Sequence, residues 1–345
     1  MLSKTILAFF LCAAIITGAL AQEPAAPQTP ATVTKQPATL EERLGADDGF
    51  AMAILITANM RGNLEVCDCN FPRGGLARRL GYLEAFRKRF KDVPVLQVEA
   101  GQFWYTSSPS DRVVMLQNDQ VVRAYTRWPV DVINLSRNDL VEAQRWLTKE
   151  GLAERQQRAP MLKSFISANS NYDDSVAAPA PFIIKEVKGP RIKGKGGKLR
   201  IGFVGLAEPY RTSDGIADAT VKNMYEAARR VVPEARKQCD VLIIVAHAEM
   251  AGAMKLATEN PEADVVIAGN AEGLFNTRQV GNTLVVPASP GNIRQGDLRI
   301  YLDQDGRARF KYVFTDLDSV VPSDPEATAY VQAARLERER ARYNQ

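Results

Sequence analysis

The sequence lacks a strong excess of charge, a rich supply of cysteine and, beyond its first residues, any long hydrophobic run. Its formal net charge of +4 at pH 7 is too small to indicate a nucleic acid or a charged membrane surface as partner. After residue 21 no apolar run reaches the roughly 20 residues that a spanning helix needs, so we expect no membrane span. Its four cysteines include no Cys-x-x-Cys-His motif, which argues against covalently bound c-type haem.

The N-terminus has the features of a secretory signal peptide. Lys4 precedes an apolar run over residues 6–20, and the Ala-Leu-Ala at residues 19–21 provides a cleavage site before Gln22. Cys12 lies inside the apolar run without the small residues that precede the cysteine of a lipoprotein, so we expect no lipid anchor. We therefore predict a signal peptide over residues 1–21 and a periplasmic or secreted protein.

The rest of the chain divides by composition into three parts. Residues 22–45 contain four prolines and almost no large apolar side chains, which predicts a disordered tether. Residues 46–322 form the predicted domain, whose ordered part begins near Phe50. A helix is expected within residues 323–345, and two roles remain open for it: packing on the domain, or serving as a charged handle for a partner.

Short apolar runs alternate with stretches of helical period, which predicts an α/β domain whose strands are buried on both faces. The last strands follow one another without helices, so we expect antiparallel meanders at the end of the sheet. The predicted strands are 52–57, 94–99, 131–135, 164–168, 181–187, 199–205, 241–246, 264–268, 283–287, 297–302 and 308–314. The predicted helices are 75–90, 112–126, 139–150, 221–238, 249–259 and 325–342.

The helix over 75–90 has the clearest amphipathic pattern. Leucine and phenylalanine recur at helical spacing along one face, and basic residues fill the other. We expect the apolar face to pack on the sheet and the basic side chains to face outward. The apolar stripe consists of Leu76, Leu80, Leu83, Phe86 and Phe90, and the outward set consists of Arg78, Arg79, Arg87 and Lys88.

Polar side chains follow most of the predicted strands, where α/β sheets bind their ligands. Asn59 and Arg61 follow the first strand, and Gln102 follows the second. The remaining strand ends carry Ser136, Arg137, Asn138 and Asp139, then His247, then Asn270 and Glu272. These loops should converge, and His247 is the one histidine of the chain.

The order NMR, GQ, SRND, AH and GNAE at these strand ends resembles the metallophosphoesterase domain of the 5'-nucleotidase group, within the calcineurin-like phosphoesterases. That family presents Asp-x-His, Gly-Asp, Gly-Asn-His-Glu or Gly-Asn-His-Asp, a single His and Gly-His-x-His at these places. "PRGGLARRLGYLEAFR" and "VVPASPGNIRQGDLRIYLDQDG" resemble its first helix and final strands. The resemblance covers about residues 50–322 and implies a layered α-β-β-α sandwich of mixed sheets.

The resemblance also implies where two divalent cations would be bound. Its ligand positions fall on Asn59, Arg61, Gln102, Arg137, His247, Asn270 and Glu272, of which His247 alone keeps the family's residue. The family positions for catalysis hold Asn138 and Asp139, so no catalytic residue is assigned. A guanidinium about 4 Å from a dication, in an effective dielectric of roughly 20, is repelled by about 8 kcal/mol.

We therefore expect no two-metal site and no firm cofactor. Manganese or zinc would bind only if the site were retained in altered form, with His247 and Glu272 as weak candidates for a single metal. Arg61 and Arg137 would instead project into the vacated space and offer planar donors to an anion. The alternative is that these arginines pair with Asp139, Glu272 and Glu99 and fill a dead site.

Cys67 and Cys69 lie one residue apart, before the predicted helix. After signal-peptide cleavage the chain keeps these two and Cys239, an odd count that leaves at least one thiol unpaired. Cys239 lies beside the apolar strand "DVLIIVA" and is expected to be a small buried hydrophobe. For Cys67 and Cys69 three interpretations remain: a structural disulfide, a redox-active pair, or ligands of a soft metal.

The leading functional prediction is an exported, catalytically degenerate protein of this fold that binds an anionic ligand or a periplasmic protein partner. The predicted ligand-binding residues are Asn59, Arg61, Gln102, Arg137, Asn138, His247, Asn270 and Glu272. One alternative is an active phosphoesterase with an atypical metal at His247 and Glu272. The other is a thiol-redox protein that uses Cys67 and Cys69.

Overall fold

A computed structural model describes residues 39–105, 111–192, 196–209, 220–271, 273 and 276–343. The predicted signal peptide, most of the predicted tether and Glu272 lie outside these ranges. Within them, no helix has both the length and the apolar character needed to cross a bilayer.

The chain alternates strands and helices through most of its length. The helices are α1 (Leu40–Leu44), α2 (Leu76–Arg89), α3 (Arg112–Arg127), α4 (Arg137–Leu147), α5 (Leu152–Arg158), α6 (Met224–Arg236), α7 (Met250–Glu259) and α8 (Pro325–Tyr343), with short 3-10 turns η1 (Pro160–Ser164) and η2 (Pro290–Asn292). The strands are β1 (Met52–Thr57), β2 (Val95–Glu99), β3 (Val132–Asn134), β4 (Phe165–Ile166), β5 (Phe182–Lys188), β6 (Lys198–Ala207), β7 (Val241–His247), β8 (Val265–Ala268), β9 (Arg278–Val280), β10 (Thr283–Pro287), β11 (Arg294–Leu302) and β12 (Ala308–Asp316).

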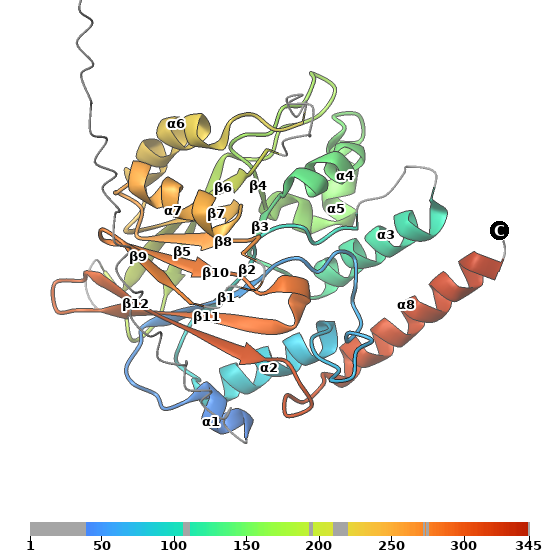
Figure 1. The fold of residues 1–345 in the computed structure, drawn as a ribbon, viewed down its shortest axis with the longest axis horizontal. Coiled ribbons are helices and arrows are strands. Elements are labelled where there is room, and N and C mark those ends of the chain that lie inside the picture. Colours follow the sequence, from blue (N-terminus) through green and yellow to red (C-terminus); the bar gives the residue numbers. More distant parts are fainter. Residues whose placement is uncertain are drawn as a thin grey trace, which may run out of the picture. The chain divides into compact units, whose positions relative to one another are not determined.

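The strands form two six-stranded mixed sheets (Figure 1). The first has the order β12-β11-β1-β2-β3-β4, in which β1 to β4 are parallel and β11 and β12 are antiparallel additions. The second has the order β5-β6-β7-β8-β10-β9, in which β6, β7, β8 and β10 are parallel. Parallel neighbours place their carboxyl ends at one edge, so the loops after β1, β2 and β3 emerge together, as do those after β7 and β8.

The two sheets pack face to face and helices cover their outer faces. In β1 the side chains alternate: Ile54 and Ile56 join the apolar layer between the sheets, while Ala53 and Leu55 join the layer under the helices. Residues of α2, α3 and α4 cover the first sheet, and residues of α6 and α7 cover the second. The predicted layered α-β-β-α sandwich of mixed sheets is confirmed.

Each predicted strand and helix has a counterpart, and the elements that sequence analysis missed share a physical reason. In α5 no residue is buried, and β9 is a short, mostly exposed edge strand, so neither presents an apolar pattern. The final strands form two separate hairpins. β9 and β10 lie in the second sheet, and β11 and β12 lie in the first, because the chain crosses between the sheets through η2.

The helix α1 lies inside the segment 22–45 that the sequence predicts as a tether. A capping box between Thr39 and Glu42 opens the helix, and Leu44 is buried. Arg43 forms an ion pair with Asp318 over 2.9 Å. Residues 40–44 therefore belong to the fold, held by a long-range ion pair that local composition does not reveal.

The prediction that Arg79 faces outward is wrong. Its side chain is 3% exposed and its guanidinium lies 3.5 Å from Glu99 and 3.0 Å from the hydroxyl of Tyr125. A helical pattern marks arginine as a surface residue, but a buried carboxylate on the neighbouring strand provides a partner for its charge. The apolar residues of the same helix are buried as predicted.

The C-terminal helix α8 packs on the domain. It contacts α2 and α3, and its Ala327, Ala334 and Arg338 are buried. The side chain of Gln120 in α3 donates to the carbonyl of Ala334 over 2.8 Å, and the hydroxyl of Tyr330 donates to the carbonyl of Gln120 over 2.6 Å. The helix α8 therefore packs on the domain, which is the first of the two roles that the sequence left open.

Candidate functional site

The loops after β1 and β2 run side by side and are joined through their backbones. The amide of Asn59 donates to the carbonyl of Gly101 over 2.9 Å, and that of Arg61 donates to the carbonyl of Gln102 over 2.9 Å. The amide of Gly62 donates to the carbonyl of Phe103 over 2.7 Å. Three of the predicted site residues are thus brought together by one backbone ladder.

The same three residues adopt an unusual backbone conformation. The φ angles of Asn59, Arg61 and Gln102 are 58°, 51° and 56°, in the left-handed region that non-glycine residues rarely enter. Each such residue costs on the order of 1–3 kcal/mol, and such strain clusters at functional sites. Asparagine tolerates this conformation well, whereas arginine and glutamine do not, and nothing in the local sequence predicted it.

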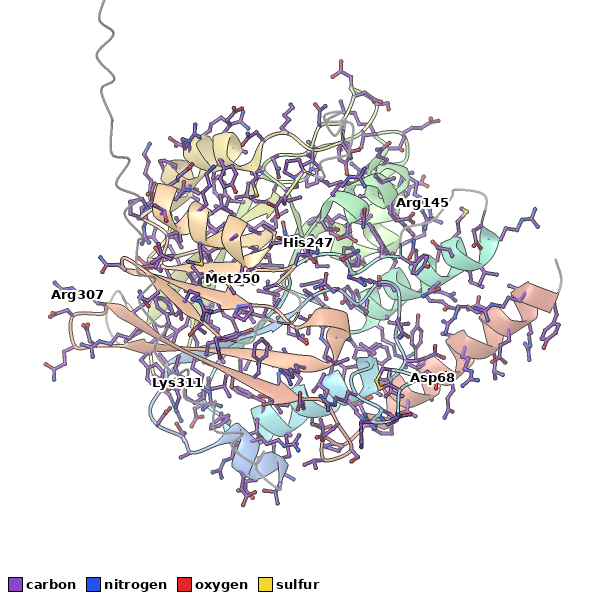
Figure 2. All side chains as sticks on the ribbon, in the orientation of Figure 1. Asp68, Arg145, His247, Met250, Arg307 and Lys311 are labelled. Atoms are coloured by element: carbon purple, nitrogen blue, oxygen red, sulfur yellow. A yellow bond between two sulfur atoms is a disulfide. The ribbon has the colours of Figure 1, made fainter. Side chains whose placement is uncertain are left out.

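His247, labelled in Figure 2, is the last residue of β7 in the other sheet. Its Nε2 atom lies 3.0 Å from Oδ1 of Asn59, and Nδ2 of Asn59 donates to the carbonyl of Gly269 over 2.7 Å. A carbonyl can only accept, so Gly269 fixes the orientation of the asparagine amide. Oδ1 must therefore accept from His247, which places the imidazole proton on Nε2.

Two glycines allow this close approach. A Cβ atom on Gly101 would lie 3.0 Å from the side chain of His247, and one on Gly269 would lie 2.5 Å from the carbonyl of Ala100. Burial, together with the nearby charge of Arg61, lowers the pKa of His247 to about 4. The imidazole is therefore neutral at physiological pH, with its Nε2 hydrogen bonded to Asn59.

Asp139, one of the two family positions for catalysis, is a buried capping residue. Its carboxylate accepts from the amides of Gln102, Trp104 and Ser136 over 2.5, 3.1 and 2.9 Å, and from the hydroxyl of Ser136 over 2.7 Å. Burial raises its pKa to about 7 despite these hydrogen bonds. Asp139 thus opens α4 and ties it to the loop after β2.

Glu99 and Asp139, two of the partners that sequence analysis considered for the site arginines, are held by other groups. Glu99 Oε2 accepts from the hydroxyls of Thr57 and Tyr125 over 3.0 and 2.7 Å and pairs with Arg79. This network, buried at the ends of β1 and β2, was missed because Arg79 was expected on the surface. Glu99 therefore belongs to the core beneath the site.

The remaining site residues lie around the strand ends with more solvent access. Arg61 is exposed, and Arg137 and Asn138 are half-buried at the start of α4, where an Nη atom of Arg137 donates to Oδ1 of Asn138 over 3.3 Å. Asn270 is half-buried after β8, and its amide donates to the carbonyl of Ala248 over 3.1 Å. Glu272 lies outside the described residues.

Sequence analysis also missed a buried asparagine that joins the two sheets beside the site. Nδ2 of Asn134, the last residue of β3, donates to the carbonyl of Leu206 in β6 over 3.0 Å. Its side chain is fully buried, and its Oδ1 has no hydrogen-bond partner in the described structure. A polar residue at the end of a three-residue strand was the available signal.

The donor set does not fit a two-metal centre. Among the residues that the structure describes, no group of three or more His, Cys, Asp or Glu side chains could hold a metal ion. The Nε2 atom of His247 carries a proton committed to Asn59 and offers no lone pair for coordination. Arg61 and Arg137, at positions that the resemblance assigns to metal ligands, carry charges that oppose a dication.

The fold is that of the calcineurin-like phosphoesterases. A 5'-nucleotidase precursor from Thermus thermophilus superposes with a TM-score of 0.63 at 18% identity, over 83% of this chain and 58% of that one. A sulfate thiohydrolase, SoxB, from the same genus and species gives 0.64 at 15% identity, over 83% and 60%. The calcineurin-like phosphoesterase YfkN from Bacillus subtilis gives 0.60 at 17% identity, over 83% and 97%.

These similarities establish the fold. The chain spans less than two thirds of the length of the nucleotidase and the thiohydrolase, and nearly all of the length of the Bacillus phosphoesterase structure. No profile of a known protein family and no curated protein matches the sequence. The strand ends predicted to carry the site thus lie on a phosphoesterase scaffold.

Proposed function

We propose that this chain is an exported protein of the metallophosphoesterase fold that binds an anionic, phosphate-bearing ligand without hydrolysing it. One observation carries the proposal: the Nε2 atom of His247, the family's surviving ligand position, donates its proton to Asn59. A metal cannot use that nitrogen unless the Asn59 amide turns and places its oxygen against the carbonyl of Gly269. Among the described residues no group of side chains is assembled to hold the metal-bound hydroxide that hydrolysis on this fold needs, which supports binding without hydrolysis.

Arg61 and Arg137 are the residues that would select an anion. Both residues stand at metal-ligand positions of the family, at the ends of β1 and β3, and both carry a permanent charge and planar donors suited to phosphate. The backbone ladder to Gln102 holds Arg61 in its strained conformation. Backbone strain of this kind clusters at functional sites, so the left-handed conformation of Arg61 supports a role in binding.

The alternative of a single-metal phosphoesterase is disfavoured by the same contacts. Its metal would need His247 and Glu272, so the hydrogen bond to Asn59 would have to break at a cost of about 1 kcal/mol or more before coordination. The metal would also lie near the positive charge of Arg61, which already lowers the pKa of His247. A ligand that carries its own negative charge meets neither obstacle.

Calorimetry of the purified, metal-free protein tests the proposal. Inorganic phosphate and adenosine 5'-monophosphate should bind, and Arg61→Ala or Arg137→Ala should weaken binding at least tenfold, since a hydrogen bond to a charged group contributes about 1.5–3 kcal/mol. Arg307→Ala, which removes a highly exposed arginine in the β11–β12 hairpin, is the matched control and should leave binding unchanged.

Hydrolysis is measured in the same samples with and without manganese or zinc. We expect no turnover of a generic phosphate ester in either condition. Metal-dependent turnover that disappears in His247→Ala would replace the proposal with the phosphoesterase alternative. Absence of binding by either anion, or unchanged binding in both arginine variants, would leave the protein-partner function as the better account of the site.

Export is part of the proposal and has a separate test. The apolar run over residues 6–20 and the Ala-Leu-Ala before Gln22 support cleavage after residue 21. Mass spectrometry of the protein from a periplasmic fraction should find an N-terminus at Gln22. Recovery of the intact chain from the cytoplasmic fraction alone would contradict export.

A further inference from the structure

A disulfide between Cys67 and Cys69 lies in the loop that joins β1 to α2, at a distance from the site around His247. The two Cα atoms are 5.4 Å apart, and one residue, Asp68, separates the cysteines. Figure 2 shows Asp68 beside α8 and His247 in a different part of the fold. The disulfide therefore needs an explanation independent of anion binding.

The two sulfur atoms have unequal surroundings. Cys67 is half-buried, and the amide of Arg73 points at its Sγ atom over 3.2 Å, while its own amide donates to the carbonyl of Arg73 over 2.9 Å. Cys69 and its neighbours Asp68 and Asn70 are exposed. An incoming nucleophile can thus reach Cys69, and a thiolate released on Cys67 would be stabilised by an amide donor already in place.

The loop is held in position without the disulfide. The amide of Leu76 donates to the carbonyl of Leu64 over 2.9 Å, and that of Gly74 donates to the carbonyl of Leu317 over 2.8 Å. Arg338 of α8 pairs with Glu65 over 3.0 Å. A bridge across one residue also removes little freedom from the unfolded chain, because this effect grows with loop length. Stabilisation alone therefore explains the bridge poorly.

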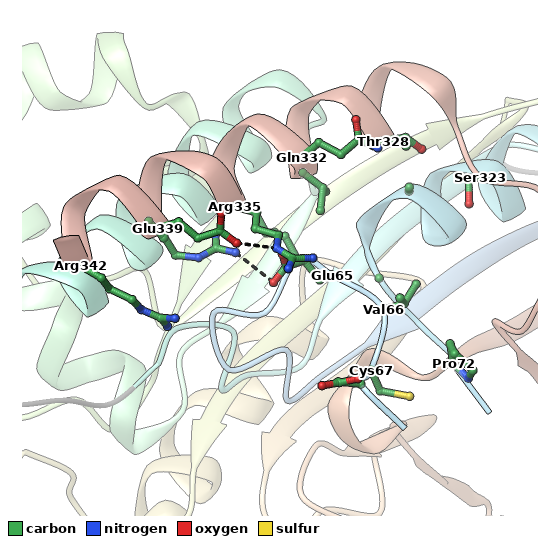
Figure 3. Close-up of a pocket in the computed structure, with 16 residues that line it drawn as sticks. Glu65, Val66, Cys67, Pro72, Ser323, Thr328, Gln332, Arg335, Glu339 and Arg342 are labelled. Atoms are coloured by element: carbon green, nitrogen blue, oxygen red, sulfur yellow. Dashed lines mark hydrogen bonds and ion pairs between the residues drawn. The ribbon is translucent and has the colours of Figure 1, made fainter. Parts of the chain in front are cut away.

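A groove of about 670 Å³ reaches Cys67, whose sulfur is bonded to that of the exposed Cys69. One wall is the loop from Leu64 to Asp68, which includes Cys67, and the other wall is α8 (Figure 3). Along α8 the opposite charges within each of the ion pairs Arg335–Glu339 and Arg338–Glu65 cancel. Phe71, beside the loop, is 75% exposed. Neutral walls and an exposed aromatic ring suit an extended polypeptide segment better than a small ion.

From these observations we propose that Cys67 and Cys69 are a thiol–disulfide exchange site whose substrate is a protein dithiol, presented on an extended segment that lies in this groove. A thiolate of the partner attacks Sγ of Cys69. A sulfur–sulfur bond forms between the partner and Cys69, the Cys67–Cys69 bond breaks, and its electron pair remains on Sγ of Cys67 next to the Arg73 amide.

The second thiolate of the partner then attacks the partner's own sulfur in the mixed disulfide and releases Cys69. Two electrons pass from the partner dithiol to the cysteine pair, and the two protons lost by the partner's thiols are taken up by the cysteine thiolates through solvent. The partner leaves as a disulfide. The reverse reaction oxidises a dithiol on this chain by a partner disulfide, so no further oxidant or reductant is required.

The test begins with the redox equilibrium of the mature protein in a Cys239→Ala background, which removes the buried third thiol. The protein is equilibrated with mixtures of reduced and oxidised glutathione, alkylated, and weighed by mass spectrometry. We expect the pair to pass between disulfide and dithiol as one two-electron couple in the native protein, with an unchanged circular dichroism spectrum. A pair that is reduced only after unfolding in denaturant would overturn the proposal.

The order of attack is tested with two matched variants. Cys67→Ser leaves the exposed Cys69, and Cys69→Ser leaves the half-buried Cys67; both changes fall in an exposed loop. Oxidised glutathione should form a mixed disulfide with Cys69 at least tenfold faster than with Cys67. Reduced thioredoxin, as a protein dithiol probe, should reduce the unmodified pair faster than glutathione at equal thiol concentration. Equal rates at the two cysteines, or no advantage for thioredoxin, would contradict the proposal.

These measurements contain no phosphate ligand, so their outcome is independent of anion binding at Arg61 and Arg137. Arg335→Ala with Arg342→Ala on α8 should not change the reaction with glutathione, because it alters the groove wall and not the sulfur atoms. The same change should slow the reaction with thioredoxin, because both side chains line the groove. Equal slowing with both reagents would place the effect on the cysteine loop and contradict a docking role for the groove.

Discussion

The proton on Nε2 of His247 is donated to Oδ1 of Asn59, across the interface between the two sheets, over 3.0 Å. The carbonyl of Gly269 determines the direction of this hydrogen bond, because it takes the amide donor of the same asparagine. Asn59 therefore joins the loop after β1 to the end of β7. It also occupies the Nε2 nitrogen of His247.

The titration of His247 tests this arrangement directly. As the one histidine of the chain, it gives a single set of imidazole signals in a nuclear magnetic resonance spectrum. We expect a titration midpoint near 4, because burial and the charge of Arg61 lower the pKa from 6.5. Arg61→Ala should raise the midpoint, whereas the charge-conserving Arg61→Lys should leave it low. A midpoint near 6.5 in the unmodified protein would mean that the ring is solvated and free.

The same shift has a stability consequence of definite sign. The folded pKa lies below the unfolded value, so the contribution of His247 is fully present above pH 6.5 and is lost as the pH falls toward 4. The loss amounts to about 3 kcal/mol at 1.36 kcal/mol per pKa unit. Asp139 acts in the opposite direction, because its raised pKa favours the folded state at low pH and that contribution is lost as the pH rises through 7.

These opposing contributions make global unfolding a poor readout for either residue alone. Comparison of His247→Gln with the unmodified protein separates them. The unfolding free energy of the variant should fall less steeply between pH 6.5 and pH 4, because the proton that the histidine would bind on unfolding is absent. Parallel curves for the two proteins would show that His247 keeps its ordinary pKa when folded.

Metal addition and removal should leave the stability of the folded protein unchanged. A metal that binds only the folded protein raises the free energy of unfolding by RT ln(1 + [L]/Kd). At a metal concentration of 100 times Kd this increase is about 2.7 kcal/mol. Because the donor set around His247 does not fit a metal, we expect the melting temperature to be the same with manganese, with zinc and with a chelator. A rise of several degrees with either metal, lost in His247→Ala, would contradict the charge argument from Arg61 and Arg137.

Most of the fold was predictable from the sequence, because strands that are buried on both faces appear as apolar runs whatever their long-range neighbours. β1, β7 and β8 are continuous apolar segments followed by polar residues, and their ends were placed within a residue or two. The segments it missed, α1 and α5, carry little apolar surface, and α1 is held by an ion pair to a residue more than two hundred positions away.

The site was predicted as a set of residues and not as a set of contacts. Asn59 and His247 were chosen by their places at strand ends, and the structure brings them together. Their hydrogen bond could not be predicted, because it depends on the orientation of one amide set by the carbonyl of Gly269 in another loop. The left-handed backbone of Arg61 and Gln102 is likewise a property of the two loops together.

The contributions of Arg79 and Glu99 to the free energy of unfolding should be strongly coupled. Arg79→Met leaves the carboxylate buried without its charge partner, and Glu99→Leu leaves the guanidinium in the same position, so each change should cost about 3–5 kcal/mol. The double variant removes both charges and should be destabilised by several kcal/mol less than the sum of the two single changes. Chemical denaturation of the four proteins gives the coupling. Additive effects would show that Arg79 reaches solvent in the folded protein.

Gly74 and Gly306 provide a matched pair for the packing of the cysteine loop. Both have a φ of 76°, so replacement by alanine imposes the same backbone strain, about 1–2 kcal/mol. A Cβ on Gly306, in the β11–β12 hairpin, would meet no atom within 4 Å, whereas one on Gly74 would lie 2.6 Å from the carbonyl oxygen of Asn292.

Because the atoms opposite Gly74 belong to the backbone, they cannot move aside like the end of a flexible side chain. Overpacking of this kind adds about 1–3 kcal/mol, so Gly74→Ala should lower the unfolding free energy by that much more than Gly306→Ala. Thermal or urea denaturation of the two variants gives the difference. Gly74→Ala should also slow the attack of glutathione on Cys69, because the Arg73 amide that would stabilise the thiolate released on Cys67 lies next to the displaced backbone. Equal destabilisation and unchanged reactivity would show that the loop after β1 is not fixed against η2.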